Sequence, residues 1–170
     1  MERITVDSAV ISECGRYRYT LTREIDPFEP RRVLWVMLNP STADATADDP
    51  TIRRLKGFSR LWGCGAFTVV NVYALRSPSP KDLWCCDDPV GPENDRYIKD
   101  ECAKVDTVVV AWGAHAKAQR VAQVHEIVRH WCRDVMCLGT TQAGAPKHPL
   151  YLPNDTALVA WQHHSASEKP

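Results

Sequence analysis

The chain has 170 residues, of which 44% are hydrophobic and 25% are charged, and these values are ordinary for a globular protein. This length favours a single domain over residues 1–170, and the balance of 21 basic and 21 acidic residues means that a polyanionic partner must meet a local basic patch. No apolar stretch approaches the roughly 20 residues of a membrane helix, no signal peptide opens the chain, and seven scattered cysteines suggest reduced thiols, so we expect a cytoplasmic protein.

Hydrophobic patterning predicts strands that alternate with helices. Residues 17–22 alternate and predict an edge hairpin over about 8–24. Apolar runs predict strands, and helical spacing predicts helices, with a proline-rich loop at 77–92 and a tail at about 162–170. The strands are expected at 33–38, 67–72, 107–112 and 134–139, and the helices at 50–62, 94–104 and 115–131. Crossover connections predict an α/β fold: a three-layer α/β/α arrangement around a central, mostly parallel four-stranded sheet, plus the N-terminal β-hairpin.

Polar side chains follow the predicted strands, at the edge where α/β folds collect their chemistry. Asn39 leaves the first strand, Asn71 ends the second, and His115 and His148 follow the third and fourth. No glycine-rich phosphate loop follows any strand.

Each of these residues also has a structural interpretation. Asn39 could cap a turn, and Asn71 could be structural at a strand end. Asp49 is favoured as a helix cap over a catalytic acid, while Asp44 is balanced between a turn former and an electrostatic participant. His115 and the basic helix that carries Arg53 suggest a solvated helix surface, although that helix starts beside Asn39 and part of it could meet phosphate.

Four segments in order resemble motifs of the uracil-DNA glycosylase superfamily. They read MLNPS at 37–41, VVNVYALRSP at 69–78, VVVAWGAHA at 108–116 and KHPLYL at 147–152. The chain also resembles a family known only as domain of unknown function 1643, through LNPSTAD, PVGPEND and GxPxHPLY elements. The first resemblance implies a uracil-DNA glycosylase-like fold that flips a base out of DNA and hydrolyses its N-glycosidic bond.

The resemblance implies a role for each matching residue. Asn39 would position the attacking water, and His148 would donate to the base oxygen where negative charge develops. Asn71 would read the base edge with its amide. Leu152 would be the wedge that fills the hole in the base stack, with Tyr151 as the alternative. Further contacts to the base are expected from Ser41, Thr42 and Tyr73, and further contacts to DNA from Lys147, Arg76, Ser77 and Arg53.

The chain departs from the superfamily at two points. Stronger catalysts carry aspartate in place of Asn39, so either the enzyme is slow or a nearby carboxylate helps, with Asp44 the first candidate and Asp48 and Asp49 the others. The thermostable bacterial branch binds an iron–sulfur cluster through cysteines, but Cys14 lacks the second cysteine of a CxxC pair. We expect no metal, no cofactor and no obligate protein partner.

Ser41 and Thr42 occupy the stretch where classical uracil enzymes place a tyrosine that excludes 5-methyl groups. The smaller residues predict a base with a bulky C5 substituent, such as hydroxymethylcytosine or its glucosylated form. Such bases mark phage genomes, so the expected role is defence against phage by making abasic sites. The alternatives are a hydrolase of free nucleosides or nucleotides and a non-catalytic nucleotide-binding protein on the same fold.

Overall fold

A computed structural model describes residues 7–163 of the chain and arranges seven strands in one sheet, in the order β1-β2-β4-β3-β5-β6-β7. The strands are β1 (Ser8–Ile11), β2 (Arg18–Glu24), β3 (Arg32–Met37), β4 (Ala66–Asn71), β5 (Thr107–Val110), β6 (Asp134–Cys137) and β7 (Val159–Ala160). Strands β4, β3, β5 and β6 run parallel to one another, while β1, β2 and β7 join the sheet antiparallel. The sheet is therefore mixed and wider than the mostly parallel four-stranded sheet that the sequence predicts.

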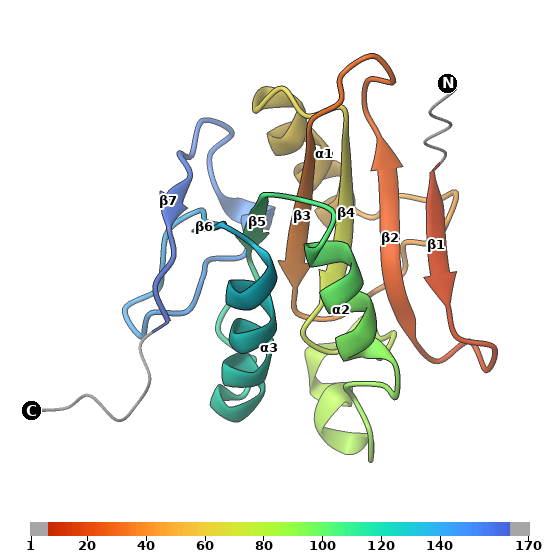
Figure 1. The fold of residues 1–170 in the computed structure, drawn as a ribbon. Helices are drawn as coiled ribbons and strands as arrows, with labels where there is room; N and C mark the ends of the chain where they lie inside the picture. Colours follow the sequence, from red (N-terminus) through yellow and green to blue (C-terminus); the bar gives the residue numbers. More distant parts are fainter. Residues whose placement is uncertain (1–6, 164–170) are drawn as a thin grey trace, which may run out of the picture.

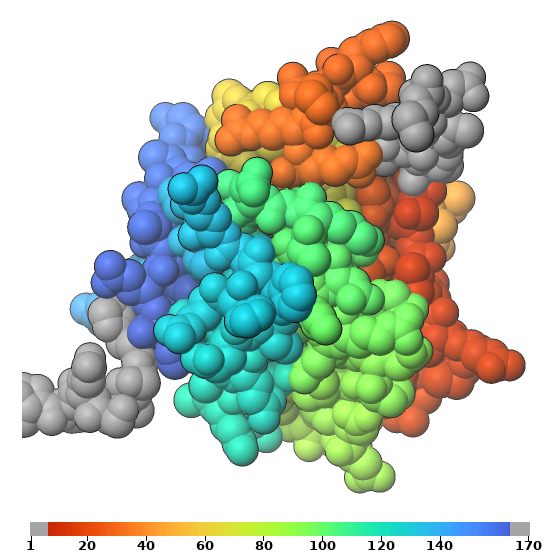
Figure 2. Space-filling view, viewed as in Figure 1, coloured from red at the N-terminus to blue at the C-terminus, as the bar shows by residue number. Residues whose placement is uncertain are grey.

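Helices cover both faces of this sheet. Helices α2 (Asn94–Cys102) and α3 (Ala118–Trp131) lie side by side in front of it, and α1 (Pro50–Leu61) lies behind it (Figure 1). Figure 2 shows α2 and α3 together covering the front face. Two short 3-10 helices, η1 (Pro80–Cys85) and η2 (Pro149–Tyr151), lie in the connections.

Strand β3 shows why the predicted strands are apolar along their whole length. Val33, Trp35 and Met37 pack in the core beneath α1, whereas Leu34 and Val36 pack in the core beneath α2 and α3. Successive side chains of a strand point to opposite faces, so a strand covered on both faces is apolar at every position. Two hydrophobic cores, one on each face, fix the position of the strand ends.

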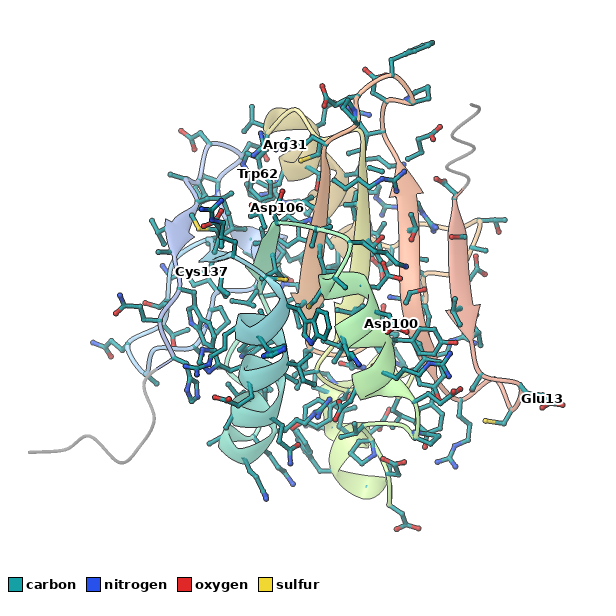
Figure 3. The ribbon with its side chains drawn as sticks, in the orientation of Figure 1. Glu13, Arg31, Trp62, Asp100, Asp106 and Cys137 are labelled. Atoms are coloured by element: carbon teal, nitrogen blue, oxygen red, sulfur yellow. The ribbon has the colours of Figure 1, made fainter. Side chains whose placement is uncertain are left out.

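Helix α1 begins and ends at strong local signals. Its N-cap is Asp49, whose carboxylate accepts a hydrogen bond from Ile52 N at 2.8 Å, and Pro50 follows at the first helical position. Trp62 caps its other end, where Arg31 donates to the Trp62 carbonyl at 3.0 Å. Figure 3 shows these two labelled residues together at the same end of the molecule. These contacts aim the start of α1 at the carboxyl end of β3.

A β-bulge interrupts the N-terminal hairpin at Tyr19. Val10 pairs with Thr20 and the next residue, Ile11, pairs with Arg18, so Tyr19 is the extra residue of β2. The bulge directs Tyr19 to the α2 side, where its ring stacks on Tyr97 at 4.8 Å. Arg18 consequently lies on the α1 side, where it donates to the Ala43 carbonyl at 2.6 Å.

Three elements differ from the sequence-based predictions. Helix α3 begins at Ala118, so His115 lies in the loop before it rather than on a helix. Residues 80–85 of the expected loop form η1, and β7 was not predicted. Most of the expected tail, residues 164–170, lies outside the described part of the chain. Within residues 7–163, no helix has the length and apolar character that a bilayer span requires.

Candidate functional site

A cavity of about 340 Å³ opens at the carboxyl ends of β3, β4 and β5. This is the place where open α/β sheets bind ligands, and the volume lies at the small end of ligand pockets. Its lining residues lie between positions 18 and 151 of the chain, and folding brings them together. The polar lining residues on which the chemistry depends are Arg18, Asn39, Ser41, Asp49, Asn71 and His148.

Asn39 is fixed at the end of β3 by its own amide nitrogen. Nδ2 donates to the carbonyls of Pro40 and Ser77, both at 3.0 Å, and lies 3.5 Å from the carbonyl of Leu75. The amide is thereby oriented, and none of residues 7–163 donates a hydrogen bond to Oδ1. Asn39 therefore lines the cavity with an oriented amide whose oxygen is left as an acceptor.

Asn71 ends β4 and is 1% exposed, yet neither its Oδ1 nor its Nδ2 has a hydrogen-bond partner among the described residues. Nearly all buried polar groups in proteins are paired, because an unpaired one loses water and gains nothing. Asn71 lines the cavity, so a ligand can supply the missing partners. Its amide offers one acceptor and two donors to that ligand.

His148 is held by hydrogen bonds that join its segment to two strand ends. Gly113 N donates to the Pro146 carbonyl and Lys147 N donates to the Gly139 carbonyl, each at 2.9 Å. His148 Nδ1 accepts from Leu150 N at 3.2 Å, so in the neutral ring the proton lies on Nε2. Burial lowers the pKa of His148, and the negative charge of Asp49 only partly opposes this effect. The ring is therefore a neutral Nε2–H donor at pH 7.

Asp49 belongs to the cavity as well as to the helix. One carboxylate oxygen caps α1, as the sequence favours, and the other accepts from Ser41 Oγ at 2.7 Å. Its charge also acts on His148 and on Arg18. The structure thus brings Asp49, rather than Asp44 or Asp48, to the side of the predicted catalytic residues.

Arg18 is a cavity residue that sequence reasoning missed. It is 2% exposed although it lies in an alternating strand segment at which an arginine normally faces solvent. The bulge at Tyr19 turns it toward α1 and the cavity, and no pattern in the sequence announces that bulge.

Tyr151 stands at the mouth of the cavity and is 93% exposed. Leu152 instead packs, half-buried, against the core beneath α1. Arg54 of α1 fastens this segment by donating to the carbonyls of Pro149 and Leu152 and to the side chain of Asn154. The structure therefore leaves Tyr151, and not Leu152, free to contact a large partner.

Several predicted site residues lie outside the cavity lining. The Asp44 carboxylate accepts from Thr46 N and Ala47 N, both at 2.9 Å, which stabilises its own loop and lowers its pKa. Tyr73 is buried, with its hydroxyl accepting from Lys117 N. The remaining residues of this group are Thr42, Arg53, Arg76 and Lys147. Ser77 and the loop residue His115, by contrast, line the cavity.

The described residues contain no group of three or more His, Cys, Asp or Glu side chains placed to hold a metal ion. The polar part of the lining instead consists of amides, hydroxyls, two imidazoles, a guanidinium and one carboxylate, set among apolar residues. Such a lining can bind an aromatic ring that carries hydrogen-bonding edges.

The fold is an α/β domain with a cavity at the carboxyl ends of its parallel strands. Residues 18–150 match the model of a family described as protein of unknown function (DUF1643), and the chain belongs to this family. No curated protein and no solved structure matches the chain.

Proposed function

We propose that the protein is a monofunctional DNA glycosylase that flips a base into the cavity and hydrolyses its N-glycosidic bond. The observation that carries the proposal is the unpaired, buried amide of Asn71. The Watson–Crick edge of a pyrimidine presents adjacent donor and acceptor groups, which complement the two ends of a carboxamide.

His148 supports the chemical step of this proposal. When the glycosidic bond breaks, its electron pair passes to the base, which becomes anionic. A preformed Nε2–H donor in a buried site stabilises that anion without having to reorganise during the reaction. The lowered pKa of His148 keeps the ring neutral. The substrate base therefore contacts a neutral Nε2–H donor.

Asn39 and Asp49 supply the opposite side of the reaction. Asn39 Oδ1 accepts a hydrogen bond from the water whose oxygen bonds to the anomeric carbon of the sugar. The water loses a proton in this step and the departing base gains one, so the charges balance. Asp49 is the carboxylate that the cavity offers for electrostatic support of the cationic sugar.

Tyr151 favours a polymer over a free nucleoside as substrate. An exposed aromatic side chain at the mouth of a base-sized cavity can enter the stack that a flipped base leaves. A hydrolase of free nucleosides needs no such residue. The finer resemblance to the uracil-DNA glycosylase fold is part of this proposal, and the four parallel strands between α1 and the α2–α3 layer support it.

The proposed substrate is a pyrimidine with a bulky C5 group, such as hydroxymethylcytosine or its glucosylated form, and the proposed role is defence against phage. Ser41 lines the cavity with a small side chain, which leaves room beside the base.

The test is base release from matched oligonucleotides, single-stranded and duplex, that carry uracil, cytosine, 5-hydroxymethylcytosine or its glucosylated form. Released bases are identified by mass spectrometry, and abasic sites are revealed by alkaline cleavage of the strand. We expect release of a modified cytosine and a loss of a hundredfold or more, about 3–4 kcal/mol, in His148→Ala. The same assay on free nucleosides distinguishes the hydrolase alternative, and no release from any substrate would refute the glycosylase.

A further inference from the structure

Two arginines of β2 lie buried on the same face of the sheet, and they differ in their partners. Arg23, 1% exposed, pairs with Asp48 at 2.7 Å and donates to the carbonyls of Thr22, Asp44, Ala45 and Ala47. Arg18, 2% exposed, donates to the Ala43 carbonyl, and its buried Nε has no partner among the described residues. Arg23 is thus a satisfied structural cation, and Arg18 is not.

The environment of Arg18 does not neutralise its charge. No carboxylate among residues 7–163 forms an ion pair with it. Asp49 is the acidic residue whose charge acts most strongly on Arg18, but its two oxygens accept from Ser41 Oγ and Ile52 N. A buried and unpaired charge is costly, and proteins avoid it by pairing the group. Since Arg18 lines the cavity, a ligand in the cavity can supply the partner that Arg18 lacks.

We infer that Arg18 is an anion-binding residue of the cavity, and that the ligand carries a carboxylate or phosphate group that reaches the β2 wall. The planar guanidinium donates two parallel hydrogen bonds to such groups, and the free Nε edge is available for one of them. The inference rests on the proposed function only in taking the rest of the ligand to be a nucleobase, held by Asn71.

Two sources of the anion are distinguishable by pairs of compounds that differ in one charged group. Deoxycytidine and deoxycytidine monophosphate differ by a phosphate, while cytosine and 5-carboxycytosine differ by a carboxylate on the ring. A preference for the nucleotide places a backbone-type phosphate at Arg18, and a preference for the carboxylated base places a C5 substituent there. Either preference supports anion binding by Arg18.

Isothermal titration calorimetry on the full chain measures both pairs, with inorganic phosphate as a further probe. In the wild type, we expect one anionic compound to bind roughly 10- to 100-fold more tightly than its neutral parent, as charged hydrogen bonds do. Arg18→Gln should remove this advantage, so that the anionic compound and its neutral parent bind with equal affinity. Arg129→Gln, which removes an equal charge from the exposed side of α3, is the matched control and should keep the advantage.

Thermal melting shows whether each variant is folded. If Arg18→Gln does not fold, Arg18→Lys decides, because it keeps the cation but lacks the Nε donor, and it should reduce the anionic advantage. The inference fails if neither anionic compound is preferred in the wild type, or if both Arg18 variants behave like Arg129→Gln. Binding of the neutral parents without an anionic preference would overturn the role of Arg18 and leave the proposed function standing. Binding of inorganic phosphate, with no binding of either neutral parent, would support the role of Arg18 and overturn the proposed function.

Discussion

Asn71 shows how a single residue can trade stability for binding. Its buried amide receives no hydrogen bond from the described residues. A buried polar group without partners costs about 1–3 kcal/mol, and a ligand in the cavity that pairs with Asn71 recovers that free energy. The residue therefore lowers stability in order to bind, while its geometry remains regular.

Asn71→Leu should raise the stability of the empty protein and abolish base release, because leucine has nearly the same shape and no unpaired polar atoms. At about 2–4 °C per kcal/mol, the melting temperature should rise by several degrees. The matched control is Asn94→Leu. Asn94 is equally buried, but its Nδ2 donates to the carbonyls of Asn71 and Val72, so this change should lower the melting temperature. A fall in both variants would show that Asn71 is an ordinary core residue.

The pH dependence of base release should follow the lowered pKa of His148. Above the ordinary imidazole pKa of about 6.5, the ring is neutral and release should be independent of pH. At lower pH, protonation puts a hydrogen on Nδ1, which can then no longer accept from Leu150 N, so release should fall as pH drops through the lowered pKa. His125→Gln removes another histidine with a lowered pKa, which lies in α3 and outside the cavity lining. The pH profile of this variant should match that of the wild type. A rate that rises with acidity would mean that the imidazolium is the active form.

At the level of elements, Tyr151 of η2 and the next residue, Leu152, are expected to have different roles, one in DNA contact and the other in packing. Tyr151→Ala should reduce release from duplex DNA far more than from single strands, where little stacking has to be broken. Leu152→Ala should instead lower thermal stability and affect both substrates equally, because Leu152 packs beneath α1. Melting curves and single-turnover rates on the two substrates separate these outcomes, and equal losses in Tyr151→Ala would argue against a wedge.

The sequence predicts elements well where local signals decide them. The cap at Asp49, the proline after it and the spacing of Ile52, Leu55 and Phe58 locate α1 without any knowledge of the sheet. Strand β7 has two residues and exists only because it pairs with β6, so no local pattern reveals it. The predicted start of α3 at residue 115 is three residues too early, because Gly113 has a φ of +75° and the chain continues as turn and loop until the helix begins at Ala118.

The site was predictable to the extent that it follows strand ends. Asn39, Asn71 and His148 leave parallel strands, and the cavity lies where those strands end. Arg18 was missed because its position depends on the bulge at Tyr19. Asp49 was favoured as a helix cap over a catalytic acid, and in the structure one of its oxygens caps α1 while the other accepts from Ser41 Oγ. Asp44 is predicted as a catalytic residue because it is close to the Asn39 motif in sequence, but its side chain does not line the cavity.

At the level of the whole molecule, the cavity is lined at Ser41 by a small side chain. Ser41→Tyr should block release of the bulky modified cytosine and spare uracil if the enzyme removes it, since the larger side chain enters the lining. Thr42→Tyr is the matched control, because Thr42 is exposed and outside the lining, and it should change little. Competition between the two bases in one reaction measures the selectivity, and the reverse pattern would place the pocket wall elsewhere.

The order of the site residues along the chain has a consequence for protein synthesis. Ribosomes make Arg18, Asn39 and Asn71 early, and His148 and Tyr151 late, after β6 is complete. Under the proposed function, a nascent or truncated chain that ends before residue 148 possesses Asn71, the residue assigned to the base edge, but lacks His148 and Tyr151, the residues assigned to the donor and the wedge. Such a chain should therefore release no base.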